Sequence, residues 1–146
     1  MPHHNKKCGI FDINKNRMHR FVFDKTEHLK KQNAIDTLFA TGKRFTVHPF
    51  RVVYIINQRH TDNAPAAQVM VIARKKLFKH AVSRNRYKRL LREAYRLHKQ
   101  PLTDTLQAHN KTMRIAFLAT SDTLPDFYIV ERQMMAAIDR LTKTVR

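Results

Sequence analysis

The segment from Arg74 to Lys99 constrains the fold more than any other, because it combines dense positive charge with helical periodicity. It contains eleven Lys or Arg residues and a single acid, Glu93. At about 100° per residue, its side chains separate onto opposite arcs of a helix. The cationic arc holds Arg84, Lys88, Arg89, Arg92, Arg96 and Lys99, and the opposite arc holds Tyr87, Leu90, Leu91, Ala94, Leu97 and His98. The pattern predicts a helix over residues 82–99, with Ser83 as its N-cap and Pro101 just beyond its end.

The charged side of this helix favours a polyanionic partner. From Arg84 to Arg96 a cation recurs at every fourth position with no acid on that row, and like charges at this spacing are mildly destabilising. The whole chain has 29 Lys and Arg against 11 Asp and Glu, a formal net charge of +18. Guanidinium groups can grip phosphate oxygens, and Asn85 can hydrogen-bond a base edge or a sugar. We therefore predict a nucleic-acid-binding surface, in preference to a solvated charged face or a membrane-binding one.

The remaining apolar patterns predict a single α/β domain over residues 21–146. A stripe at helical spacing lies between a cap at Asn33 and a stop at Gly42, and alternating or continuous apolar runs predict strands. The predicted elements are helix 33–41, strands 45–47, 50–57 and 69–74, helix 82–99, strand 113–119 and a helix around 130–141. The order α-β-β-β-α-β-α predicts an α+β two-layer fold, in which helices pack on a four-stranded sheet.

The chain lacks the residue patterns of a self-sufficient catalyst. Its eleven acids are scattered, and its two glycines cannot make a Gly-rich phosphate loop. His80 and His98 flank the basic helix and are the best candidates for acid–base chemistry, but no nucleophile or orienting group accompanies them at recognisable spacing. We expect no catalytic side chain in the protein.

The first 20 residues predict a flexible basic tail, because they are poor in apolar periodicity. His3, His4 and Cys8 lie in this tail, but nothing downstream completes a zinc site, so no protein-bound metal or cofactor is expected. A single cysteine excludes a disulfide framework and fits a reducing cytoplasm. No apolar run approaches a membrane span or a signal peptide, so no membrane partner is expected. No obligate protein partner is evident from the sequence either.

The basic helix also carries a recognisable motif. Lys75-Lys76 is followed by Ala81-Val82-Ser83-Arg84-Asn85-Arg86-Tyr87-Lys88-Arg89-Leu90-Leu91-Arg92-Glu93. This run resembles the signature of the bacterial ribonuclease P protein component, which is a Lys-Lys pair followed by Arg-Asn-Arg-x-Lys-Arg-x-x-Arg-Glu on the second helix. The run Phe39-Ala40-Thr41-Gly42-Lys43-Arg44 and the predicted element order extend the resemblance, which covers about Phe21 to the C-terminus.

The resemblance implies a subunit of an endoribonuclease. The family is the small protein of a ribozyme that cuts the 5′ leader from precursor tRNA, and its RNA subunit performs the hydrolysis with Mg²⁺. By analogy, the ribonuclease P RNA would be contacted by Lys75, Lys76, Arg84, Asn85, Arg86, Lys88, Arg89, Arg92 and Arg96. The family's cleft between the first helix and the sheet holds the single-stranded leader, and we expect Phe39, Ile35 and Tyr54 to line it.

Two differences from the family pattern, and one topological feature of the family, bear on the expected structure. Ile35 stands where the family commonly has phenylalanine, and Leu77-Phe78-Lys79-His80 replaces a short Gly-Asn link that many members carry. The family also joins its third and fourth strands by a left-handed crossover, against the usual right-handed rule. The resemblance therefore implies a hand of connection that general topology would predict wrongly.

Two other functions fit parts of the pattern. A structural RNA-binding protein of ribosomal type would show the same charge, but not the extended match from Arg84 to Glu93. A helix-turn-helix DNA reader would need a short helix before the basic one, where residues 69–74 predict a strand. Neither would affect cleavage of precursor tRNA.

Overall fold

The computed structural model describes residues 23–61 and 63–146. The predicted basic tail, including His3, His4 and Cys8, lies outside the described residues.

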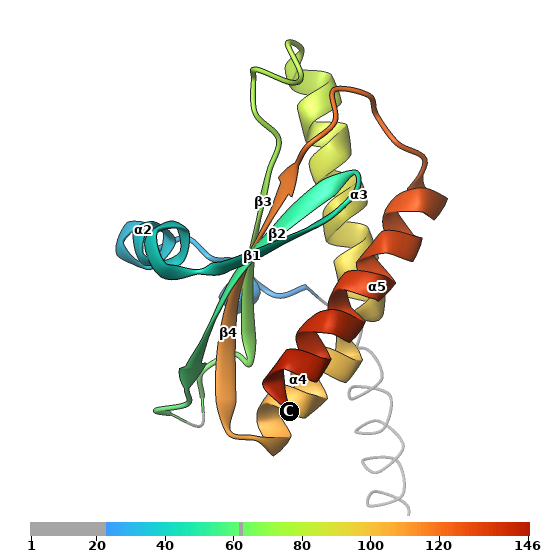
Figure 1. Ribbon diagram of the computed structural model, residues 1–146. Coiled ribbons are helices and arrows are strands. Elements are labelled where there is room, and N and C mark those ends of the chain that lie inside the picture. Colours follow the sequence, from blue (N-terminus) through green and yellow to red (C-terminus); the bar gives the residue numbers. More distant parts are fainter. Residues whose placement is uncertain (1–22, 62) are drawn as a thin grey trace, which may run out of the picture.

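A four-stranded sheet in the order β1-β2-β4-β3 forms the centre of the fold (Figure 1). Its strands are β1 (Lys43–Val47), β2 (Phe50–Gln58), β3 (Ala67–Ile72) and β4 (Lys111–Ala119). β2 pairs antiparallel with both β1 and β4, whereas β3 and β4 are parallel. The parallel pair is joined by a long helical crossover, as parallel strands require. The predicted number of strands and their positions along the chain are confirmed.

Helices cover the two faces of the sheet unequally. After the short 3₁₀ helix η1 (Lys25–Glu27), α2 (Gln32–Thr41) lies alone against one face. The opposite face is covered by α3 (Ala81–His98), α4 (Gln100–Ala108) and α5 (Phe127–Val145). α5 packs against both α3 and α4. The two long helices, α3 and α5, run beside each other in Figure 1. One face is therefore deeply buried and the other only partly covered.

The core follows this division, because successive side chains of a strand point to opposite faces. On the side of the long helices, Tyr87, Leu91, Phe117 and Leu141 are fully buried in one large cluster. On the side of α2, a smaller cluster joins Leu29, Ala34, Leu38, Val53, Ala116 and Leu118. Half-buried Met70 and Ile72 of β3 pack against this smaller cluster, whereas Val69 and Val71 belong to the large one, so both faces of β3 are covered.

Helix ends differ from prediction at several points. α2 begins after Lys31 and α3 after His80; neither has a side-chain cap, so the predicted caps Asn33 and Ser83 are wrong. Helix α4 was not predicted at all. Pro101 stands in the first turn of α4, where its missing N–H costs no hydrogen bond, and does not mark the end of helical structure.

Lys99, at the junction of α3 and α4, does not belong to the charged surface. Its side chain is 4% exposed, and its Nζ lies 2.6 Å from Oε1 of Glu27. Glu27 itself closes a capping box with Asp24 at the start of η1. A buried ion pair therefore ties the N-terminal segment to the junction between two helices.

Candidate nucleic-acid interface

The exposed cations of α3 form a row shifted by part of a turn from the predicted one. Arg86, Arg89 and Arg92, at i, i+3 spacing, are exposed, whereas Arg84 and Lys88 are half-buried. No side-chain hydrogen bond or ion pair joins these three arginines to any residue that the structure describes. Asn85 is exposed beside them. Because Tyr87, Leu91, Ala94 and Tyr95 are buried on the other side, α3 is anchored while its arginines face solvent.

Arg84 and Arg96 have structural partners. Nη1 of Arg84 donates to the carbonyl oxygens of Phe78 at 2.9 Å and of Lys79 at 3.3 Å. Arg96 forms a bidentate pair with Glu93, with nitrogen–oxygen distances of 2.6 and 3.0 Å. The hydrogen bond from Arg96 holds the pKa of Glu93 below its ordinary value. Arg96 therefore offers less free positive charge to an anion than the exposed row does.

The loop before α3 presents the predicted lysine pair. Lys75 and Lys76 are exposed in a turn in which the amides of Leu77 and Phe78 both donate to the carbonyl of Arg74. Phe78 is buried, and its ring centroid lies 5.4 Å from that of Tyr87. The loop is thus fastened to α3 by an aromatic contact as well as by Arg84, and its lysines extend the charged surface beyond the helix.

A pocket of about 540 Å³ opens beside the exposed arginines. Its apolar members are Phe23 from the segment before η1, Leu90 from α3 and Phe127 from the first turn of α5. All three side chains are half-buried against the core. Its charged members are Arg86, Arg89, Arg92, Glu93 and Arg96. The sequence gives no local signal for this pocket, because its aromatic members are far from α3 along the chain.

The predicted leader cleft is only partly assembled. Ile35 and Phe39 of α2 are half-buried and pack on the smaller cluster beside Val53. Tyr54, one residue further along β2, belongs to the large cluster on the other face, where its ring meets Phe45 at 5.9 Å. Placing Tyr54 beside Phe39 was therefore an error of one residue, which reverses the face of a strand.

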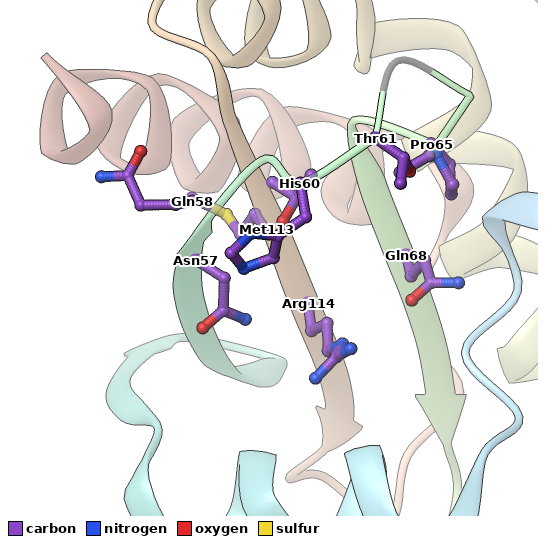
Figure 2. A pocket seen from close by; sticks show the side chains of 10 residues that line it. Asn57, Gln58, His60, Thr61, Pro65, Gln68, Met113 and Arg114 are labelled. Carbon is purple, nitrogen blue, oxygen red and sulfur yellow. The ribbon is translucent and has the colours of Figure 1, made fainter.

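Polar side chains continue the α2 side of the sheet into a second pocket, of about 510 Å³ (Figure 2). Asn57, Gln68 and Arg114 reach it from β2, β3 and β4, and His60 reaches it from the following loop. Arg114 also lines a neighbouring pocket with Lys31, Gln32 and Asn33 at the start of α2. Gln68 and Arg114 are polar residues directly beside apolar runs of β3 and β4, and this was the available sequence signal for the pocket.

His80 and His98, the predicted candidates for acid–base chemistry, lie at the two ends of α3. The described residues include no group of three or more His, Cys, Asp or Glu side chains that could hold a metal ion. His98 is half-buried, with Nε2 3.5 Å from Oε1 of Glu131. His80, the N-cap of α3, is exposed. None of the helices in the described part of the chain has the length and apolar character that crossing a bilayer requires.

Comparison with known proteins gives a consistent result. The protein-family model described as Ribonuclease P matches residues 23–142. The ribonuclease P protein component of Porphyromonas gingivalis is 45% identical over 125 residues, covering 86% of this chain and 90% of that protein. The same component of Chlorobium phaeobacteroides is 30% identical over 152 residues, covering 99% of this chain and 96% of that protein.

Solved structures agree at the level of the fold. The RNase P protein from Thermotoga maritima matches with a TM-score of 0.60 at 20% identity, covering 78% of this chain and 96% of that one. The RNase P protein from Staphylococcus aureus matches with a TM-score of 0.50, also at 20% identity, covering 82% and 95%. Since the family model and the relatives span nearly the whole described region, including the arginine row of α3, this chain belongs to the ribonuclease P protein component family and is part of an endoribonuclease that processes tRNA.

Proposed function

We propose that the protein binds the catalytic RNA of ribonuclease P through α3 and the lysine loop, and binds the 5′ leader of precursor tRNA on the α2 side of the sheet. The observation that carries the proposal is the row Arg86, Arg89 and Arg92, which is exposed and has no carboxylate partner among the described residues. Repulsion within the row is relieved when phosphates replace water as its neighbours. Lys75 and Lys76 would extend the same contact.

The leader would lie against the incompletely covered face of the sheet. Phe39 and Ile35 offer half-buried apolar surface there, and Asn57, Gln68 and Arg114 offer hydrogen-bond donors further along. An aromatic and aliphatic platform binds single strands with little regard to sequence, because every base has an apolar face. A subunit that serves many different precursors needs this tolerance.

Hydrolysis would be performed by the RNA subunit with Mg²⁺, and the protein would hold substrate and RNA together. The described side chains fit this division of labour, since they provide cations and apolar surface but no cluster of metal-binding groups. The protein would act by neutralising phosphate charge near the site where RNA-bound ions work.

The test is cleavage of a precursor tRNA by a bacterial ribonuclease P RNA at low Mg²⁺, with and without the protein. We expect cleavage to be stimulated only when RNA and protein are both present. Cleavage by the protein alone would reveal an active site in the chain. Tight RNA binding without stimulation would instead support a structural RNA-binding role and refute the proposal.

The arginine row is tested by the salt dependence of binding to the RNA subunit. Arg89→Ala should weaken binding and reduce the slope of log affinity against log salt by about one unit. Lys143→Ala is a suitable control, because Lys143 is an exposed cation at the end of α5 that is paired with Asp139 at 3.1 Å. Equal slopes in both variants would place Arg89 outside the interface.

The leader site is tested by substrate length. Phe39→Ala should raise the Michaelis constant for precursors with long leaders, with little effect on binding of the RNA subunit. Equal losses on precursors with and without an extended leader would contradict the assignment.

A further inference from the structure

The pocket beside the arginine row has the composition of a nucleotide site. We propose that it accepts one unstacked nucleobase of the RNA subunit, while Arg86, Arg89 and Arg92 hold the phosphates on either side of it. This inference rests on the proposed RNA-binding function and adds the state of the RNA at the contact, which would be an unpaired nucleotide and not a duplex backbone.

The walls of the pocket come from three separate parts of the chain. Phe23 precedes η1, Leu90 lies on α3, and Phe127 begins α5. Phe23 is fixed from behind, because its ring lies 4.2 Å from that of His28 and 5.6 Å from that of Tyr95. Apolar walls that are anchored in the core favour a preformed pocket, and about 540 Å³ falls within the usual range for small-molecule sites.

The charged side chains of the pocket indicate which class of ligand it binds. Four arginines and one glutamate line the pocket, and the glutamate is already paired with Arg96. A purely apolar ligand would leave the arginines unused, and an acidic peptide would bring no flat surface for the rings. A nucleotide supplies both components, since its base is a planar apolar disc and its flanking phosphates accept from guanidinium groups.

A regular double helix would leave the apolar walls of the pocket without contacts. The bases of a duplex are stacked and paired, so only phosphates and sugars would meet a recess bordered by arginines. Half-buried aromatic and aliphatic side chains gain from contact only if a base leaves its stack. A single-stranded or bulged position is therefore required.

Phe127→Trp gives a direct probe, because the chain contains no tryptophan. Stacking of a base on the indole should quench its fluorescence when the full-length protein is titrated with ribonuclease P RNA. Tyr128→Trp is the matched control, since Tyr128 is the next residue of α5, is 71% exposed and does not line the pocket. Quenching of the tryptophan at 127 but not at 128 is expected; equal or absent quenching at both would overturn the proposal.

Two further measurements distinguish insertion of a base into the pocket from binding of phosphates by the arginines. An oligouridylate should quench the tryptophan at 127 more than a duplex of the same length does, and equal quenching by both would refute base insertion. Phe127→Leu, which keeps apolar packing, should weaken RNA-subunit binding about tenfold with an unchanged salt slope, because no charge is removed. A changed slope or an unchanged affinity would contradict the pocket.

The outcomes for the pocket and for the proposed function are distinct. Specific quenching by the RNA without stimulated cleavage would leave the pocket standing and refute the role in ribonuclease P. Stimulated cleavage without quenching would support the role in ribonuclease P and refute the pocket.

Discussion

Two buried tyrosines on α3 make a matched pair for testing how polar groups are satisfied in this core. Tyr87 and Tyr95 are both 0% exposed. The hydroxyl of Tyr87 donates to the carbonyl oxygen of Pro49 at 2.7 Å, whereas the hydroxyl of Tyr95 has no hydrogen-bond partner among the described residues. Burial raises the pKa of both tyrosines, so both hydroxyls are protonated under ordinary conditions. We therefore expect opposite effects from removing them.

The size of each change in stability follows from the hydrogen bonds that each tyrosine hydroxyl makes. Tyr87→Phe removes one buried hydrogen bond, but the carbonyl of Pro49 keeps a second donor, the amide of Thr120 at 3.0 Å. The loss should therefore be near the ordinary net value of about 1 kcal/mol, without the full penalty of an orphaned acceptor. Tyr95→Phe removes a hydroxyl that is buried without compensation, and should be neutral or stabilising by up to about 1 kcal/mol.

Both variants can be unfolded in guanidinium chloride and fitted with one common dependence of free energy on denaturant concentration. This measures the difference between their free energies of unfolding. We expect Tyr87→Phe to lower the free energy of unfolding and the melting temperature, the latter by about 3–5 °C, with Tyr95→Phe at or above the parent. A loss with Tyr95→Phe as large as that with Tyr87→Phe would refute the reasoning, because it would mean that the second hydroxyl also has a stabilising partner.

Three other predictions concern stability. Lys99→Met should lower the free energy of unfolding by about 2–3 kcal/mol in chemical denaturation, because it leaves the mostly buried carboxylate of Glu27 without this cation. The additional change Glu27→Gln should recover part of the loss. Gly42→Ala should lower the unfolding free energy by about 1–3 kcal/mol, because a Cβ there would collide with the carbonyl oxygen of Leu38; a neutral result would mean that the backbone can move aside. Burial, and then the charge of a nearby arginine, lowers the pKa of His28, so the unfolded state binds its proton more readily and stability should fall as pH drops below about 6.5. In His28→Asn, unfolding midpoints between pH 8 and pH 5 should change less than in the parent protein.

Most of the fold could be predicted from the sequence because its periodicities are strong. Alternation placed β2, and a helical stripe placed α5, within a few residues of their observed bounds. Helix α4 was not predicted because a proline after a helical pattern usually indicates its end, although proline also suits the first turn of a new helix, where Pro101 stands. The burial of Lys99 could not be predicted, since its partner Glu27 lies 72 residues away in the sequence.

The candidate site was predicted less completely than the fold. The helical pattern placed charge on the correct side of α3, but an angular plot cannot show which arginines bond to nearby groups, as Arg84 and Arg96 do. Tyr54 was assigned to the face that belongs to Val53, because residues 52–56 are all apolar and do not show which face of β2 meets α2. The pocket at Phe127 depends on tertiary packing that no local pattern encodes.

The bonds from Arg84 to the loop have a consequence for the thermodynamics of assembly. By joining α3 to the backbone at Phe78 and Lys79, they set the spacing between the lysine pair and the arginine row before any RNA arrives. Free loops lose conformational entropy when they bind, and that loss subtracts from affinity. In the proposed complex with RNA, these bonds would place part of that ordering in the folding of the protein, so the proposed interface would be preorganised. Under this proposal, Arg84 would contribute to affinity by restraining the loop that carries the other cations, and not by contacting a phosphate itself.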